Sequence, residues 1–243
     1  MKDLPNIYGF NKTSEAGKDV FAYSIFLQGC NFRCPYCMNA RLVRGEVDKP
    51  IPIDEIKKSV EENDTEWVMI SGGEPTFTDI VLLTNLIDEI RSWGCEVGMS
   101  TNGSKPDILG KIIDRLDFVA MDVKTASHID YDKISEEIGI EVKERIRQSK
   151  TLLEKRKADS KGQFDYEIRT TLYPPFFRDD YDLYRMSYYV INKSDRWVFQ
   201  QFRHNKNMLD PEACKVEPFS EDKLKEILEE AKKYCADVSI RYV

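Results

Sequence analysis

Short runs rich in β-branched and aromatic residues alternate along this chain with longer stretches in which apolar positions recur at helical spacing. Such runs are typical of buried strands, and the longer stretches are typical of amphipathic helices. The pattern predicts strands at Phe21–Leu27, Trp67–Ser71, Glu96–Ser100, Phe118–Val123, Tyr166–Leu172 and Arg196–Phe202, with a short last strand at Val238–Val243 at one edge. It predicts helices near residues 53–62, 79–92, 106–115, 140–157, 180–192 and 220–234. Ser220 is the expected N-cap of the last helix, and Thr78 or Asp79 that of the second.

This regular alternation of strands and helices predicts βαβ units and a parallel sheet. About six such units favour an α/β fold, a partial (β/α)6 TIM-like barrel, over a closed barrel of eight strands. The sequence shows no internal repeat and no linker rich in Pro, Gly or Ser, so residues 1–243 are expected to form a single domain.

The unusual motifs of the chain all follow predicted strands. A cysteine-rich segment follows the first strand, Gly-Gly-Glu-Pro at 72–75 follows the second, and Ser-Thr-Asn-Gly at 100–103 ends the third. Asp122 and Lys124 end the fourth. Because function gathers at the carboxyl ends of parallel strands, we expect one site at this rim.

Composition narrows the function classes only slightly. The chain is 41% hydrophobic and 33% charged, with a formal net charge of −7. Nucleic-acid binding depends largely on Lys and Arg, so we expect no nucleic-acid partner. The start of the chain lacks the apolar core of a signal peptide, and no run reaches the length of a membrane span. We therefore expect a cytoplasmic protein with no membrane partner.

Three of the six cysteines, Cys30, Cys34 and Cys37, lie on one short loop with C-x3-C-x2-C spacing. Thiolates so close together suit an iron–sulfur cluster or zinc. Structural zinc needs four protein ligands, and the only histidines, His128 and His204, are remote in sequence. A zinc site with one remote ligand stays open as an alternative. On a four-iron cluster, three ligands leave one iron free to bind a substrate. Cys95, Cys214 and Cys235 are scattered and are expected to be ordinary buried cysteines.

The cysteine loop together with Ser71-Gly-Gly-Glu-Pro75 resembles the radical S-adenosylmethionine (SAM) superfamily. The resemblance implies a barrel of the radical SAM type and a [4Fe-4S] cluster held by Cys30, Cys34 and Cys37. It also implies that SAM binds the open iron and is cleaved to methionine and a 5′-deoxyadenosyl radical. In such enzymes the cofactor supplies the chemistry, while the protein orients it and excludes side reactions.

The same resemblance implies a set of SAM contacts. Gly72 and Gly73 would meet the methionine amino group, Glu74 would shape the turn, and Ser100 and Asn102 would reach the ribose. The remaining implied contacts are Tyr36, Cys37, Met38, Asp122, Val123, Lys124, Arg169 and His204. Arg169 either lines the barrel lumen or forms a structural salt bridge, and His204 either contacts SAM or is an exposed loop residue. His128 is expected to be an exposed loop residue.

Among radical SAM proteins, the chain is most similar to the activating enzymes of glycyl-radical enzymes, in particular the type for anaerobic ribonucleoside-triphosphate reductase. The similarity is carried by residues 26–37, Glu167–Thr171 and Trp197–Phe202. It implies an oxidoreductase with a glycyl-radical enzyme as protein substrate and a low-potential electron donor such as flavodoxin or ferredoxin. Met38 replaces a common histidine, and Ser100 replaces an aspartate near a cation site. The alternatives are a small-molecule enzyme similar to 7-carboxy-7-deazaguanine synthase and a non-catalytic zinc or iron–sulfur module.

Overall fold

The computed structural model describes residues 3–13 and 21–241 of the chain. Its strands form an eight-stranded sheet in the order β1 to β8. Strand β1 pairs antiparallel with β2, and every later neighbouring pair is parallel. The strands are β1 (Ile7–Thr13), β2 (Ala22–Leu27), β3 (Trp67–Gly72), β4 (Glu96–Thr101), β5 (Phe118–Asp122), β6 (Asp165–Leu172), β7 (Arg196–Gln201) and β8 (Asp237–Arg241).

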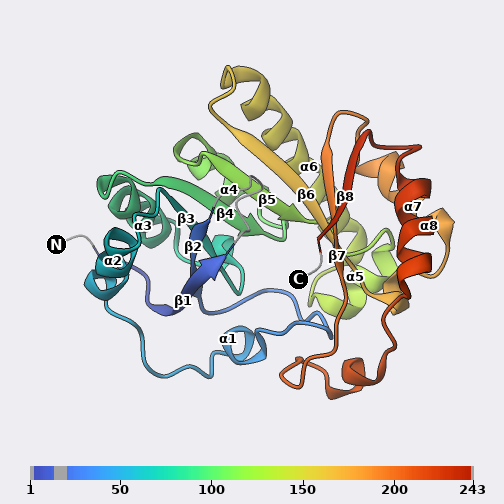
Figure 1. Cartoon of the computed structure of the whole chain (residues 1–243), viewed down its shortest axis with the longest axis horizontal. Helices are drawn as coiled ribbons and strands as arrows, with labels where there is room; N and C mark the ends of the chain where they lie inside the picture. The colour runs from blue at the N-terminus through green and yellow to red at the C-terminus, as the bar shows by residue number, and fades with distance from the viewer. Residues whose placement is uncertain (1–2, 14–20, 242–243) are drawn as a thin grey trace.

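Helices cover the outer face of the curved sheet, while α1 lies below the strands in the view of Figure 1. The α-helices are α1 (Ala40–Arg44), α2 (Ile53–Glu62), α3 (Ile80–Ser92), α4 (Pro106–Ile112), α5 (His128–Ile134), α6 (Gly139–Asp159), α7 (Asp180–Tyr189) and α8 (Glu221–Ala231). Short 3-10 helices occur at η1 (Pro75–Phe77), η2 (Ile113–Arg115), η3 (Pro174–Phe176) and η4 (Pro211–Lys215). No helix in the described ranges combines the length and apolar character that crossing a membrane would need.

The predicted partial parallel barrel is confirmed, since β2 to β8 correspond to the strands read from the sequence. The last strand is Asp237–Arg241, so residues 242 and 243 of its predicted range lie outside the described residues. Both N-cap predictions hold: the Ser220 side chain accepts a hydrogen bond from Lys223 N, and the Asp79 side chain accepts from Val81 N and Leu82 N.

Strand β1, with the short helices α1 and α5, was not predicted. β1 is an edge strand that pairs only with β2 among the described strands, and most of its residues are half-buried or exposed. Its hydrophobic pattern is therefore weak. The helices α1 and α5 span five and seven residues, too short for a helical period to stand out.

The barrel lumen is closed at the amino ends of the strands by side chains. Ala22, Trp67, Met69, Phe118 and Ala120 form a buried apolar cluster separate from the main core. They alternate along their strands with core residues such as Val68 and Val119, so they face away from the helices. Gly98 leaves room for Met69, because a Cβ there would lie 2.2 Å from the Met69 sulfur. The lumen is thus filled at one end, and its polar strand ends lie at the other.

Candidate active site

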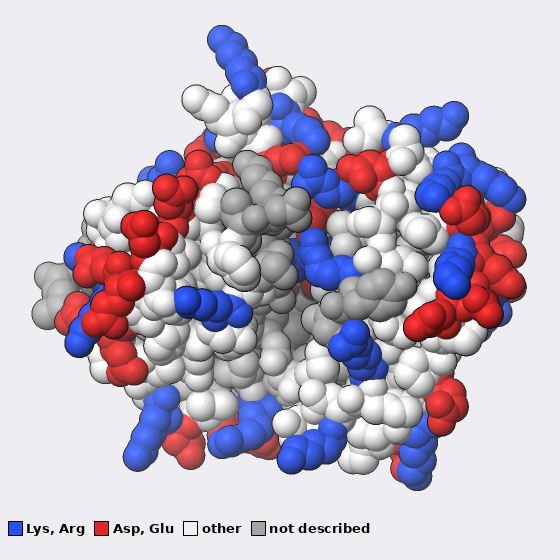
Figure 2. All heavy atoms as spheres, in the orientation of Figure 1, with Lys and Arg blue, Asp and Glu red and all other residues white. Residues whose placement is uncertain are grey.

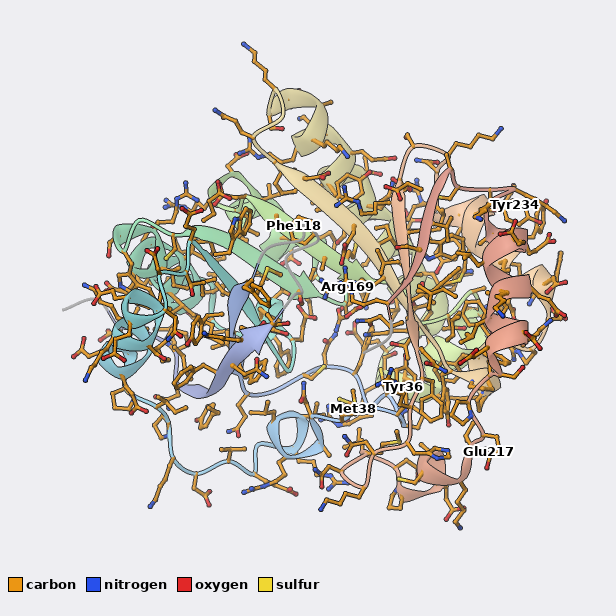
Figure 3. The ribbon with its side chains drawn as sticks, in the orientation of Figure 1. Tyr36, Met38, Phe118, Arg169, Glu217 and Tyr234 are labelled. Carbon is orange, nitrogen blue, oxygen red and sulfur yellow. The ribbon has the colours of Figure 1, made fainter. Side chains whose placement is uncertain are left out.

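A cavity of about 420 Å³ opens at the carboxyl ends of the strands. Its lining comes from the loop after β2 and from the ends of β3 to β7. The predicted site residues that line it are Cys30, Cys34, Tyr36, Cys37, Met38, Gly72, Gly73, Glu74, Ser100, Asn102, Asp122, Lys124, Arg169 and His204. In Figure 3, Tyr36 and Met38 lie near each other, and Arg169 lies between them and Phe118. Val123 does not line the cavity, since its side chain is fully buried in the core.

The cysteine loop is fixed by its own backbone hydrogen bonds. Gly29 N donates to Leu42 O at 2.9 Å, and Cys37 N donates to Cys34 O at 3.0 Å. These bonds turn all three thiols toward the cavity, and none of the three is in a disulfide. Burial raises the pKa of Cys30 and Cys34 to about 12. Both are therefore neutral thiols at neutral pH, and a bound metal would displace their protons.

The donor set suits a cluster better than a single metal ion. In the part of the chain that the structure describes, no three Cys, His, Asp or Glu side chains approach closely enough to hold one ion. In a four-iron cluster each thiolate binds a different iron. Three thiols that lie too far apart to share one ion can therefore still be its ligands. The hydroxyl of Tyr36, which is buried among these thiols, has no hydrogen-bond partner in the described structure. Such a group is costly unless a bound molecule satisfies it.

Glycine allows the Gly-Gly-Glu-Pro turn to cross directly over the cysteine loop. Gly73 N donates to Leu27 O at 2.9 Å, and Glu74 N donates to Gly29 O at 2.8 Å. A Cβ on Gly73 would lie only 1.9 Å from Gly29 O. Gly72 has a φ of +106°, in the region that favours glycine. The two loops are thus held in backbone contact beside the cavity.

We expect Gly73→Ala to disrupt this crossing, because the new methyl group meets a backbone oxygen that no side-chain rotation can move. The free energy of unfolding should fall by about 1–3 kcal/mol, as overpacking typically costs. Iron incorporation should fall with it, since the cysteine loop must shift. Chemical denaturation and iron analysis measure both effects. Gly110→Ala in α4 is the control, since its Cβ would lie 3.5 Å from its nearest neighbour in the structure, Leu152. Unchanged iron content in Gly73→Ala would contradict the expectation.

Glu74 joins the ends of β3 and β4. Its side chain is 1% exposed, and burial raises its pKa although its hydrogen bonds oppose that shift. Oε1 accepts hydrogen bonds from Thr76 N, Thr76 Oγ1 and Thr101 Oγ1 at 3.0, 2.6 and 2.7 Å. Oε2 accepts from Asn102 N at 2.6 Å. The sequence indicated a role in shaping the turn, and the structure adds a link to the next strand.

A second polar network joins the β4 end to the cysteine loop. Asn102 Nδ2 donates to Asn31 Oδ1 at 3.0 Å, and Asn31 Nδ2 donates to Ser104 Oγ at 2.8 Å. Ser104 Oγ in turn donates to Asn102 Oδ1 at 2.6 Å. Sequence reasoning missed Asn31 and Ser104. The available signal was an amide between two cysteines on a loop expected to be buried, where polar groups need partners.

Charged side chains from β6 and from the end of β5 line another part of the cavity. Lys124 Nζ lies 2.9 Å from Asp122 Oδ2, and this carboxylate raises the pKa of Lys124 against the opposing effect of burial. Arg169 both lines the cavity and forms an ion pair, with Nε 2.5 Å from Glu167 Oε1. Its Nη1 also lies 3.4 Å from Ser100 Oγ. Arg169 therefore both lines the lumen and forms a salt bridge, which were the two alternatives that the sequence left open.

The two histidines have different positions. His204 is exposed, lines the cavity mouth, and its Nε2 lies 2.6 Å from Val216 O. It is thus both exposed and placed at the cavity. His128 is exposed at the start of α5 and does not line the cavity. That agrees with the expectation of an exposed residue.

A model of the radical SAM superfamily matches residues 24–164, which include the cysteine loop, the glycine turn and the ends of β4 and β5. The chain belongs to the radical SAM superfamily. Members of this superfamily use a [4Fe-4S] cluster and SAM, so these are its cofactors. The chain is accordingly a radical SAM enzyme.

Two curated relatives refine the comparison. A protein of Methanocaldococcus jannaschii, provisionally assigned as a glycyl-radical enzyme activating enzyme, is 30% identical over 226 residues. The match covers 90% of this chain and 88% of that protein. A 7-carboxy-7-deazaguanine synthase of Methanopyrus kandleri is 35% identical over 120 residues, covering 41% of this chain and 48% of the relative.

Solved structures agree on the radical SAM fold. A radical SAM methyltransferase from Sphaerobacter thermophilus superposes with a TM-score of 0.63 at 12% identity, covering 92% of this chain and 67% of that one. A domain of a pyruvate-formate lyase-activating enzyme from Bacteroides vulgatus gives a TM-score of 0.51 at 15% identity, covering 72% and 98%. At such identities these structures support the fold alone.

Proposed function

We propose that this radical SAM enzyme is an activating enzyme that generates a glycyl radical on a partner protein. The observation that carries the proposal is the 30% identity to the Methanocaldococcus jannaschii protein along 90% of the chain. The partner that the motifs favour is anaerobic ribonucleoside-triphosphate reductase. A hydrogen atom would pass from a backbone glycine of the partner to C5′ of the SAM-derived radical. No general base is required for this transfer.

In this proposal Cys30, Cys34 and Cys37 would hold the cluster, which would supply the electron needed to cleave SAM. The wall groups then orient SAM. Backbone groups of Gly72 and Gly73 receive the methionine amino group. The other proposed contacts are Tyr36, Met38, Glu74, Ser100, Asn102, Asp122, Val123, Lys124, Arg169 and His204, with Val123 contributing through its backbone alone.

The residues of the chain have two tasks, orientation and exclusion of water. Glu74 and Asn102 fix the loops that carry the proposed contacts, so SAM meets a preformed wall. Tyr36 lines the cavity and packs against the buried Tyr173, with ring centroids 4.8 Å apart. This apolar wall would protect a radical from water. Met38, which lines the cavity and is 51% exposed, would leave apolar surface at the mouth for a partner.

The experiment that tests the proposal uses reconstituted protein, SAM, dithionite and anaerobic ribonucleoside-triphosphate reductase under anaerobic conditions. We expect an organic radical in the EPR spectrum of the reductase, formed in step with 5′-deoxyadenosine. A reductase whose radical-bearing glycine is replaced by alanine is the control and should show none. Cleavage of SAM without a radical on the wild-type reductase would contradict the choice of partner.

A second candidate is a small-molecule radical SAM enzyme similar to 7-carboxy-7-deazaguanine synthase. The match to the Methanopyrus kandleri enzyme favours it, as do the polar lining residues Thr171, Gln200 and Gln201. A pterin substrate would then raise the melting temperature of the protein, whereas an activating enzyme would not respond. The non-catalytic zinc or iron–sulfur module predicts instead that the purified protein holds zinc, or a cluster indifferent to SAM.

A further inference from the structure

Five exposed cations adjoin the cavity mouth on two segments of the chain, residues 28–44 and 202–209. Neither segment contains an acidic residue, although the whole chain has a formal net charge of −7. The first segment includes the cysteine loop and α1, and the second follows β7. We call these residues the basic face; they are Arg33, Arg41, Arg44, Arg203 and Lys206.

Hydrogen bonds join the two segments into one surface. Leu209 N donates to Cys37 O at 2.9 Å, and Asp210 N donates to Pro35 O at 3.0 Å. Arg44 Nη2 donates to Leu209 O at 2.8 Å. The basic face therefore lies directly over the cysteine loop. In Figure 2 acidic side chains gather on the left and right flanks, while basic ones predominate along the lower edge, where α1 and the segment after β7 lie.

The positive charge of this face is not neutralised by the protein. None of the five cations forms an ion pair within residues 3–13 and 21–241. Arg33, Arg41 and Arg44 donate to backbone carbonyl oxygens instead. Of the acids that follow the two segments, Glu212 pairs with Lys215 at 2.6 Å and Asp210 accepts from Glu212 N. Glu46 and Asp48 are exposed just after α1, but neither forms an ion pair with these cations in the described residues. A concentrated positive patch on an acidic protein attracts an acidic partner and speeds its association.

We propose that the basic face docks an acidic one-electron carrier protein that reduces the cluster. One electron would leave the carrier's reduced flavin or iron–sulfur group, and the oxidised cluster would gain it; no bond or proton is exchanged. The cysteine loop lies between this face and the cavity, so docking here gives the electron a short path. The inference rests on the proposed cysteine ligands and on radical SAM chemistry, and not on the identity of the substrate.

Charge favours a carrier protein over a nucleic acid as the occupant. Only five cations form the face, and the flanks beyond it are rich in acidic residues that would repel a long polyanion. A small acidic protein needs to match only the patch itself. Transient electron-transfer complexes of this kind also have small interfaces, below about 1,200 Å² of buried area.

The test reverses two charges of the basic face in the cluster-loaded protein. Arg41→Glu with Lys206→Glu is the variant, because both side chains are exposed and neither lines the cavity. Lys111→Glu with Lys161→Glu is the matched control, with the same change in charge. Those lysines precede β5 and β6, so they lie at the opposite rim of the barrel. Reduced flavodoxin is the carrier.

Two readouts separate docking from other roles. We expect flavodoxin to bind the basic-face variant at least about tenfold more weakly than wild type, and wild-type binding to weaken as salt is raised. We expect SAM cleavage driven by flavodoxin to slow similarly, while cleavage driven by dithionite stays at the wild-type rate. The control double variant should match wild type in all measurements. No partner enzyme is present, so the result does not depend on the glycyl-radical proposal.

Three results would overturn the inference. Flavodoxin binding could be unchanged in the basic-face variant, or reduced equally in the control. Dithionite-driven cleavage could fall as much as flavodoxin-driven cleavage, which would mean that the face supports the cavity and not the carrier. Finally, a single-stranded RNA could bind the wild-type face in preference to flavodoxin, which would identify a nucleic-acid surface.

Discussion

Replacing Cys30, Cys34 or Cys37 by alanine is expected to abolish cluster assembly and SAM cleavage together. The three thiols face one cavity, and each would hold a different iron, so no remaining ligand can replace a missing one. Among the described residues no further Cys, His, Asp or Glu completes a metal-binding group with them. Iron and sulfide analysis of anaerobically reconstituted protein measures assembly, and release of 5′-deoxyadenosine with dithionite measures cleavage.

The other three cysteines provide matched controls, because none of them lines the cavity. Cys95 and Cys235 are buried as expected, whereas Cys214 is only half-buried. Cys95 Sγ lies 3.4 Å from Thr65 O, Cys214 Sγ 3.1 Å from Asn205 O, and Cys235 Sγ 3.1 Å from Asp195 O. Their alanine variants should keep about four irons per chain. Full iron content and activity in a triple variant of Cys30, Cys34 and Cys37 would falsify the assignment of the ligands. So would loss of iron from any single control.

The sequence predicted the sheet well because buried parallel strands produce strong patterns. Strands such as Trp67–Gly72 and Phe118–Asp122 are almost continuous apolar runs, and each ends in a motif that breaks the pattern. The motifs then fell on one rim because parallel strands place all their carboxyl ends together. That is why most proposed site residues could be named without a structure.

Contacts between distant segments could not be read in the same way. Asn31 and Asn102 meet only because the loops after β2 and β4 converge, and Arg44 reaches Leu209 across most of the chain. Contacts of this kind produce no periodic pattern in the sequence around either residue. Arg169 is an intermediate case: Glu167 lies two residues earlier on the same strand face, so its partner was within reach of strand alternation. Arg241, which also pairs with Glu167, required the register of β8.

Polar networks join the loops of the rim to one another. Gly73 and Glu74 fix the β3 loop to the cysteine loop, and Asn102 fixes the β4 loop to both. Each bond joins loops that are far apart in sequence, so each restricts the rim more than a local turn would. Buried networks of this kind are sensitive to loss of a single acceptor, because every donor left over is unsatisfied.

Glu74→Gln is therefore expected to weaken SAM binding and to destabilise the fold, although the side chain keeps its shape. All four groups that bond to Glu74 are positioned as donors, and a glutamine amide NH2 would face at least one of them. An unsatisfied buried donor costs about 1–3 kcal/mol, so the free energy of unfolding should fall by that amount. If about 1.4 kcal/mol of this lost free energy affects the loops that bind SAM, the dissociation constant of SAM rises about tenfold.

Equilibrium dialysis of SAM with the cluster-loaded variant measures the affinity, and denaturant titration measures the stability. Glu89→Gln is the control, since the Glu89 carboxylate on α3 accepts a hydrogen bond from Trp93 Nε1 and lies outside the cavity lining. The control should bind SAM as wild type does. A loss of stability in Glu74→Gln without any change in SAM affinity would mean that Glu74 only supports the fold. Wild-type values for both would mean that the bonds from Thr101 and Asn102 do not control the geometry of the rim.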